Sequence, residues 1–271
     1  MAEPKMRLDR LMVEKGLVAS RQRAQAMIMA GNVLVNSQLV EKSGHPVSEG
    51  SEITLKGEAL PYVSRGGLKL EKALEAFEVS VQDLVCLDVG ASTGGFTDCL
   101  LQHGASRVYA VDVGYGQLAW QLRQDSRVIP IERMNIRNMP LNMLPGPVDL
   151  VTIDVSFISL KIVVPSVMKF LSKSSRMIAL IKPQFEVGKG KVGKGGVVRD
   201  PMQHESVIDE LKRFFKDNGW SFLPVLPSPI LGPSGNREFL IHLSFPEFRK
   251  AEHGHDYFPP SMLMRDAFHG F

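Results

Sequence analysis

Four ionisable residues stand where a folded chain would gather them at one edge of a sheet. Asp154 and Lys182 each end an apolar, strand-like run, and Glu238 begins another such run. Lys69 lies in a helix-like segment ahead of these runs. Taken singly, each residue is most simply explained by a structural ion pair. Two amines and two carboxylates in one cleft, however, can orient a hydroxyl group and remove its proton, which is general acid–base chemistry.

A glycine-rich turn follows the first strand-like run of the larger part of the chain. The turn reads Gly90-Ala91-Ser92-Thr93-Gly94-Gly95-Phe96, and its glycines let the backbone pass close to a ligand. A dinucleotide-binding turn would carry the spacing GxGxxG, whereas this one reads GxxxGG with Asp88 two residues ahead of it. The spacing argues against an oxidoreductase. It favours a cofactor without phosphates, such as S-adenosylmethionine, whose cationic amino end Asp88 would reach.

Two further polar residues stand at the ends of the next strand-like runs. Asp112 stands 24 residues after Asp88, where an acid accepts hydrogen bonds from ribose hydroxyls. Asn135 comes after the third run, and we expect it to meet the adenine of the cofactor. The turn and the two acids together predict a methyltransferase. The residues expected to bind the cofactor are Asp88, Gly90, Ala91, Ser92, Thr93, Gly94, Gly95, Phe96, Asp112, Asn135 and Asp154.

Strand-like and helix-like segments alternate from residue 63 onward. The expected strands are 84–89, 107–113, 127–131, 149–155, 177–182, 221–226 and 238–244. The expected helices are 68–77, 96–103, 117–124, 160–171 and 202–218. Such alternation with short connections predicts an α/β fold, a Rossmann-like and mostly parallel sheet with helices on both faces. Ligands in these folds bind beyond the carboxyl ends of the strands, where the ionisable residues are expected.

The first sixty residues form a separate, basic module. Two helices are expected, one from Arg7 to the C-cap candidate Gly16 and one over 21–30, followed by short strands over 33–36 and 51–55. The helices and their flanks carry six cations against two acids, Asp9 and Glu14. Charge alone fits a solvated helical face as well as a nucleic-acid contact. The cations are Lys5, Arg7, Arg10, Lys15, Arg21 and Arg23.

The order of residues in this module resembles the S4 RNA-binding domain. The matching positions are Arg7-Leu8-Asp9, Leu11, Gly16, Ser20-Arg21, Ala24, Ile28, Gly31, Val33 and Val35-Asn36. The resemblance implies a small α+β fold in which Arg21 and Arg23 face an RNA backbone. Contacts of that kind exchange bound counterions for fixed cations and position a protein on RNA. We expect Arg7, Arg10, Lys15, Arg21 and Arg23 to contact RNA.

The four ionisable residues, in the order Lys-Asp-Lys-Glu, resemble the catalytic tetrad of the FtsJ-type ribose 2′-O-methyltransferases. With the S4-like module and the segments 63–70, 195–201 and 232–239, the chain resembles the TlyA family of ribosomal RNA methyltransferases, some of which carry a haemolysin label. The resemblance implies S-adenosylmethionine as cofactor, ribosomal RNA and ribosomal subunits as partners, and the ribose 2′-hydroxyl of cytidine as acceptor. It implies that Lys69, Asp154, Lys182 and Glu238 are catalytic and that the last strand is antiparallel. We assign Lys182 as the base.

A second basic segment, 188–199, is rich in glycine and carries no acid. A mobile surface loop is one interpretation, and contact with the RNA backbone is the one we favour. This segment adds Lys189, Lys191 and Lys194 to the RNA-binding candidates, and Arg65 is a further candidate outside it. Phe157 and Phe185 flank the acids of the expected cleft. They can stack on cofactor or base, or belong to the core, and the sequence leaves both readings open.

Composition bounds the remaining choices. The 271 residues are 44% hydrophobic and 23% charged, with a net charge of +3, as in soluble globular chains. Cys86 and Cys99 show no metal-ligand spacing, and no apolar run approaches membrane-spanning length. We expect a cytoplasmic protein without signal peptide, membrane partner or metal. The expected organisation is an S4-like domain over 1–60, a linker over 61–65, an FtsJ-like domain over 66–245 and a tail over 246–271. A non-catalytic ribosome-assembly protein and a haemolysin are the alternatives.

Overall fold

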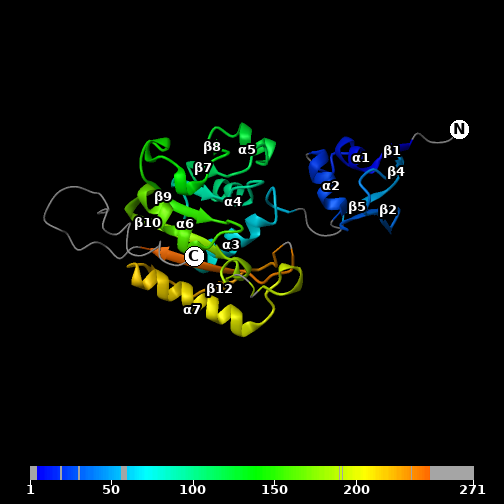
Figure 1. Ribbon diagram of the computed structural model, residues 1–271. Coiled ribbons are helices and arrows are strands. Elements are labelled where there is room, and N and C mark those ends of the chain that lie inside the picture. Colours follow the sequence, from blue (N-terminus) through cyan, green and yellow to red (C-terminus); the bar gives the residue numbers. More distant parts are fainter. Residues whose placement is uncertain are drawn as a thin grey trace. The chain divides into compact units, whose positions relative to one another are not determined.

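The computed structural model describes residues 5–18, 20–29, 31–55, 60–188, 190, 192–232 and 234–244. The chain divides into two compact units, Met1–Leu60 and Pro61–Phe271 (Figure 1). The expected tail and the two basic residues Lys189 and Lys191 lie outside the described residues.

The small unit packs two helices against short antiparallel strands. Its elements are β1 (Lys5–Arg7), α1 (Leu8–Glu14), α2 (Arg21–Met29), β2 (Val33–Val35), β3 (Gln38–Leu39), β4 (Pro46–Ser48) and β5 (Ile53–Leu55). β1 pairs with β4, and β2 lies between β3 and β5. The core includes Leu8 and Met12 of α1 and Ile28 of α2, all fully buried. The sequence predicts both helices, β2 and β5, but not the other three strands, which are too short to show a periodic pattern.

The large unit is built on one eight-stranded sheet with the strand order β11-β13-β10-β9-β6-β7-β8, to which β12 adds by pairing with β13. Its strands are β6 (Val85–Val89), β7 (Arg107–Val111), β8 (Val128–Ile131), β9 (Val148–Ile153), β10 (Leu171–Ile181), β11 (Ser221–Phe222), β12 (Leu226–Pro227) and β13 (Phe239–Ser244). Its α-helices are α3 (Gly66–Ala76), α4 (Gly95–Gln102), α5 (Trp120–Gln124), α6 (Leu160–Val167) and α7 (Pro201–Asp217). Its 3₁₀ helices are η1 (Ile136–Asn138), η2 (Leu141–Met143), η3 (Met168–Phe170), η4 (Pro183–Phe185) and η5 (Lys194–Gly196).

The direction of the strands confirms the predicted fold class. β8, β7, β6, β9 and β10 run parallel, and β13 is antiparallel to β10 from Ile181–Phe239 to Arg176–Ser244. The start of β13 therefore lies beside the carboxyl ends of the parallel strands. The residue that precedes β13 is brought to the same edge as the residues that follow β9 and β10.

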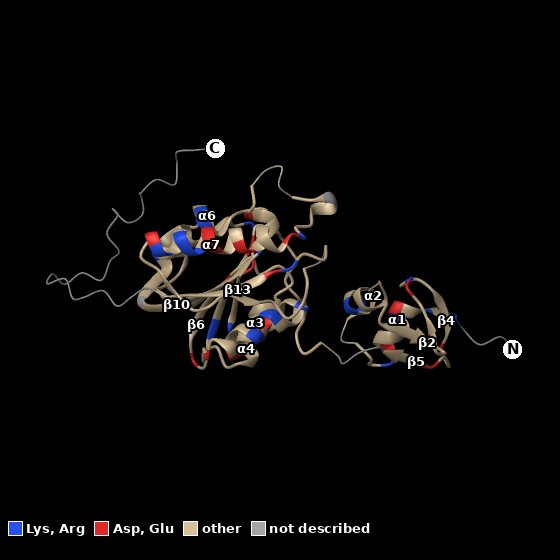
Figure 2. Cartoon of the chain, turned by 90° about the horizontal axis from the view of Figure 1, so that it is seen from below, with Lys and Arg blue, Asp and Glu red and all other residues tan. Residues whose placement is uncertain are grey.

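Alternating side chains of the strands form two separate cores. In β10, Met177, Ala179 and Ile181 pack in the layer of α6 and α7, whereas Ile178 and Leu180 pack in the layer of α3 and α4. This period of two is what a sheet covered on both faces requires. The helices lie on both sides of the sheet (Figure 1). α7 buries one stripe of residues, and its charged residues, coloured blue and red in Figure 2, lie outside that stripe.

Several expected elements have other bounds, and for two of them a local feature of the sequence gives the reason. β10 begins at Leu171 rather than at 177, because its first half is polar and hides the strand pattern. Within it, Ser175 is buried and its hydroxyl donates to the carbonyl of Val148 at 2.5 Å. The expected strand 221–226 is split into β11 and β12, because Pro224 has no N–H for the ladder. The helix expected over 160–171 ends at Val167 and continues as η3.

Residues 61–65, expected to be a linker, are instead packed onto the large unit. Tyr62 is 2% exposed, and its hydroxyl donates to Glu71 of α3 at 2.7 Å. The backbone N–H of Val63 donates to the carboxylate of Asp98 in α4 at 2.7 Å. The sequence misses this packing because Pro61 interrupts any regular element, as residues in a connection between domains do.

The contact between Tyr62 and α3 predicts a measurable cost for one added methyl group. A Cβ on Gly67 would lie 2.2 Å from the ring of Tyr62, which is buried and cannot move aside. We expect Gly67→Ala to lower the free energy of unfolding in urea by about 1–3 kcal/mol, although alanine is the better helix former. Gly146→Ala is the matched control, since no atom lies within 4 Å of its Cβ. Equal stability of the two variants would contradict the packing of 61–65.

Candidate active site

A cavity of about 320 Å³ opens at the carboxyl ends of β6, β9 and β10. Three of the four ionisable residues singled out by the sequence line it: Lys69 of α3, Asp154 after β9 and Lys182 after β10. The other residues lining it are Ser64, Arg65, Gly66, Gly90, Ala91, Ser92, Thr93, Gly95, Phe96, Ser156, Ile230 and Leu231. The glycine-rich turn and the ionisable groups therefore share one cavity.

The four ionisable residues form two ion pairs. Lys182 Nζ lies 2.6 Å from Asp154 Oδ1, and it donates a hydrogen bond to Ser156 Oγ at 3.1 Å. The contact with Asp154 is an ion pair without hydrogen-bond geometry, since Oδ1 has no hydrogen-bond partner among the described residues. Lys69 Nζ donates to Glu238 Oε2 at 2.5 Å. Each pair joins an amine to a carboxylate from a different strand or helix.

Glu238 does not line the cavity itself but lies behind Lys69. Its side chain is 1% exposed and that of Lys69 is 8% exposed. The second carboxylate oxygen, Oε1, is buried without a hydrogen-bond partner among the described residues, and a Cβ on Gly232 would lie 2.4 Å from it. Glu238 is thus enclosed, and its hydrogen bond from Lys69 fixes that amine at the cavity wall.

The glycine-rich turn is shaped by two neighbouring strands. Gly90 has a φ of +86°, and a Cβ there would lie 2.4 Å from the backbone oxygen of Asp154. The N–H groups of Gly90 and Ala91 both donate to the carbonyl of Val111 at the end of β7. Only glycine adopts this conformation in so narrow a space. The turn is held between the ends of β7 and β9, with its backbone facing the cavity.

Asp88 has a different place from the one expected. It lies inside β6, is fully buried and does not line the cavity. Its two oxygens accept hydrogen bonds from the hydroxyls of Thr97, at 2.7 Å, and Thr152, at 3.0 Å. Burial raises the pKa of Asp88 to about 6, against the effect of the two hydroxyl groups, and the nearby charge of Asp154 adds to the rise. Asp88 therefore joins β6, β9 and α4 beneath the turn.

Asp112 and Asn135 lie outside the cavity lining as well. Asp112 is half-buried and accepts from the backbone N–H groups of Ser92 and Gly114, at 2.8 and 2.7 Å. Asn135 caps η1, where its side-chain oxygen accepts from the backbone and the side chain of Arg137. Contact of either residue with a cofactor stays a prediction.

Phe157 is not a core residue. Its side chain is 89% exposed, and its φ of +63° is uncommon for a residue with a bulky side chain. The ring lies 4.9 Å from that of Phe185, tilted by 48°. The exposed ring excludes the core interpretation for Phe157, and stacking on a cofactor or a base remains its expected role.

Sequence reasoning missed five residues of the cavity: Ser64, Gly66, Ser156, Ile230 and Leu231. Ser156, two residues after Asp154, contacts Lys182, and its position after a strand-end acid is the signal that would have found it. Ile230 and Leu231 belong to the connection between β12 and β13. That connection has no periodic pattern, so nothing in the sequence links these residues to the site.

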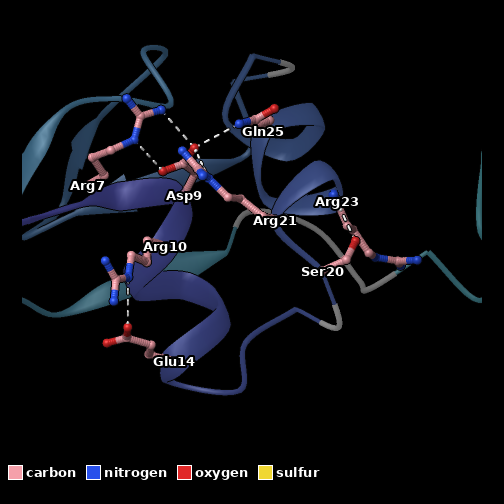
Figure 3. A network of polar contacts seen from close by, with 8 residues as sticks. All are labelled: Arg7, Asp9, Arg10, Glu14, Ser20, Arg21, Arg23 and Gln25. Carbon is pink, nitrogen blue, oxygen red and sulfur yellow. Dashed lines mark hydrogen bonds and ion pairs between the residues drawn. The ribbon is translucent and has the colours of Figure 1, made fainter. Parts of the chain in front are cut away.

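Several cations expected to bind RNA have partners within their own unit. In the small unit, Arg7 and Arg21 both contact Asp9, and Arg10 pairs with Glu14 (Figure 3).

The remaining candidates differ in their surroundings. Lys15 donates to the carbonyl of Ser51 at 2.9 Å, and Arg23 to that of Leu60 at 2.8 Å. Arg65 is exposed and lines the cavity, and Lys194 is the first residue of η5.

Comparison with known proteins identifies a family model for each unit. A model described as "FtsJ-like methyltransferase" matches residues 62–245, and one described as "S4 domain" matches residues 6–53. YqxC of Bacillus subtilis, provisionally named an rRNA methyltransferase, is 50% identical over 247 residues, covering 91% of this chain and 88% of its own.

Two further proteins are similar over nearly the whole chain. The 16S/23S rRNA (cytidine-2′-O)-methyltransferase TlyA of Mycobacterium tuberculosis is 46% identical over 238 residues, covering 88% of this chain and 89% of its own. A solved structure of a hemolysin-named protein from Streptococcus thermophilus is 45% identical with a TM-score of 0.70, covering 97% of this chain and 94% of its own.

The raised pKa of Asp88 predicts a pH dependence of stability. An unfolded aspartate has a pKa near 3.9, so a native pKa of about 6 means that the folded protein binds the extra proton. The burial of this charge therefore destabilises the fold above pH ~6, and the penalty disappears as the pH falls to ~4. Relative to wild type, we expect Asp88→Asn to gain about 3 kcal/mol of unfolding free energy between pH ~4 and pH ~7. If the difference in unfolding free energy between the two proteins, measured in urea, stayed constant across this range, the burial of a charged Asp88 would be refuted.

Proposed function

The chain belongs to the TlyA family of S4-containing, FtsJ-like methyltransferases, and from this premise we propose that it methylates the ribose 2′-hydroxyl of cytidine in ribosomal RNA. S-adenosylmethionine is the proposed methyl donor. The observation that carries the proposal is the cavity in which the Lys182–Asp154 ion pair faces the glycine-rich turn. The M. tuberculosis relative, named for this reaction, supports the choice of acceptor.

The glycine-rich turn and the acid Asp154 fit a cationic cofactor without phosphates. Asp154 belongs to the cavity wall, and its carboxylate, paired with Lys182 through Oδ1, places a negative charge there. The turn from Gly90 to Phe96 contains no lysine or arginine that would recognise a phosphate. The backbone of the turn and Asp154 would hold the cofactor, and Asp112 would bind its ribose. The bound cofactor supplies a methyl group that is already activated for transfer.

The chain must then align a hydroxyl group and accept its proton. Lys182 lies at the cavity wall, with Asp154 and Ser156 fixing the position of its Nζ. To act as base, Lys182 must first release its ammonium proton, and its 11% side-chain exposure leaves a path to solvent. Lys69, fixed by Glu238, places a second cation where it can orient the acceptor oxygen. Alignment of the hydroxyl group and removal of its proton both lower the barrier to methyl transfer.

We expect residues of both units to bind RNA. The S4-like unit supplies cations for the phosphate backbone, which positions an RNA without selecting its sequence. In the large unit, Arg65 is exposed at the cavity and Phe157 offers an exposed ring on which a base can stack. Lys189 and Lys191 of the basic segment stay candidates on sequence grounds alone.

Neither alternative is favoured by a specific observation. A non-catalytic assembly protein has no need of the two ion pairs at the cavity. For the haemolysin alternative, none of the helices among the described residues has the length and hydropathy to span a bilayer. A cytoplasmic location stays a prediction from the sequence.

The proposed base leads to a test with labelled S-adenosylmethionine and separated ribosomal subunits. We expect label to enter the RNA with wild-type protein, and Lys182→Ala to lower the rate by about 10²-fold or more, because a positioned base contributes at least that much. Cofactor affinity, measured by calorimetry, should persist in the variant. Lys161→Ala, which removes an amine from α6 paired with Glu210, is the control and should match wild type. Near-normal turnover by Lys182→Ala would exclude Lys182 as the base, and a wild-type protein that binds cofactor without labelling RNA would exclude the proposed function.

A further inference from the structure

The small unit contains a carboxylate that is buried beneath two arginines. Asp9, the second residue of α1, is 0% exposed, whereas the side chains of Arg7 and Arg21 are 50% and 55% exposed. Figure 3 shows the three side chains converging with Gln25 of α2. A charge in such a place must be fully paired. Its partners come from the end of β1 and from α2, so Asp9 joins three elements.

The carboxylate of Asp9 accepts four hydrogen bonds. Arg7 donates from Nε to Oδ1 at 3.0 Å and from Nη2 to Oδ2 at 2.9 Å. Oδ2 also accepts from Arg21 Nε at 2.9 Å and from Gln25 Nε2 at 2.8 Å. The guanidinium of Arg7 holds the pKa of Asp9 well below its usual range, and Gln25 and Arg21 add to this effect against the cost of burial. Asp9 is therefore a permanent anion under the two arginines.

The two guanidiniums keep donors that this network does not use. A guanidinium has five N–H groups in a planar fork. Arg21 uses only Nε, and Arg7 leaves Nη1 unused, since these Nη groups have no hydrogen-bond partner among the described residues. One carboxylate also neutralises only one of the two positive charges. Half-exposed donors and an uncompensated charge on one surface suit an anion with several acceptor oxygens.

A glycine independently fixes the place of Arg7. A Cβ on Gly44, in the connection between β3 and β4, would lie 2.9 Å from Nη1 and 3.3 Å from Cζ of Arg7. The guanidinium of Arg7 therefore lies against the backbone of Gly44, and its Nε and Nη2 donate to the carboxylate of Asp9. The neighbouring pair of Arg10 and Glu14 lacks such support, with side chains 66% and 46% exposed.

We propose that Asp9 is a positioning residue for RNA, which holds Arg7 and Arg21 together as one receptor for a backbone phosphate. The inference rests on the proposed function, since it takes RNA as the substrate. Asp9 touches no substrate itself. It acts by keeping two long side chains in a single arrangement before RNA arrives, so that less conformational freedom is lost on binding.

A positioning role for Asp9 and simple electrostatics predict opposite effects of Asp9→Asn on the affinity for RNA. Asp9→Asn removes a negative charge from an RNA-binding surface, which by simple electrostatics strengthens binding. If Asp9 positions the arginines, the same variant binds ribosomal subunits about 10-fold more weakly at low salt. The slope of log affinity against log salt should also shrink by about one, as for a lost phosphate contact. In methyl transfer, KM should rise while kcat at saturating subunits stays unchanged.

Two further variants separate positioning from charge and from folding. Glu14→Gln removes the same charge from the same helix, but its pair is exposed, so binding should be unchanged or tighter. Gly44→Ala keeps every charge and displaces only the flexible end of Arg7, so it should weaken binding with little loss of thermal stability. Thermal unfolding of the full chain, followed by circular dichroism, shows whether each variant folds. If Asp9→Asn does not fold, Gly44→Ala tests the positioning role.

The outcomes distinguish this inference from the proposed function. Weaker binding by Asp9→Asn and Gly44→Ala, with Glu14→Gln at or above wild type, supports the positioning role. The positioning role is overturned if folded Asp9→Asn binds as tightly as wild type or more tightly. If Asp9→Asn does not fold, the same result with Gly44→Ala overturns it. Methylation of RNA by the wild-type protein is unaffected by either result. A wild-type protein that neither binds nor methylates ribosomal subunits overturns the proposed function, and this inference with it.

Discussion

The ion pair between Lys69 and Glu238 is the interaction on which the site depends. It joins residues 169 positions apart in the sequence, from the first helix of the large unit and the start of its last strand. Both side chains are more than nine-tenths buried, so removal of either partner would leave an uncompensated charge, at a cost of about 3–5 kcal/mol. The pair forms only when β13 has entered the sheet in its antiparallel direction. The cavity is therefore complete only in the fully folded domain.

A second constraint is the crowding of backbone at the ends of β6, β7 and β9. Gly90 passes against the backbone of Asp154, and Asp88 ties the strands together underneath through two threonine hydroxyls. The turn and the Lys182–Asp154 pair are thus parts of one rigid edge of the sheet. Functional groups supported in this way keep the geometry that alignment of a substrate requires.

Much of the fold and part of the site could be predicted from the sequence, because they follow from periodicity. Alternation of strands and helices predicts the layers, and strand-end positions predict that Asp154 and Lys182 meet. The contacts of other site candidates depend on long-range packing that periodicity does not show. Asp88 follows the pattern of a strand-end acid, yet its partners Thr97 and Thr152 come from α4 and β9 and enclose it. In the small unit, counting cations could not show that Asp9 organises two of them.

The identity of the methylated nucleoside tests the proposed reaction most directly. Ribosomal subunits treated with the protein and S-adenosylmethionine would be digested to nucleosides and separated by mass-detected chromatography. We predict a gain of 2′-O-methylcytidine, because Lys182 is proposed to deprotonate a ribose hydroxyl group that Lys69 orients. A methyl group on a cytosine ring atom, with an unmodified ribose, would contradict it.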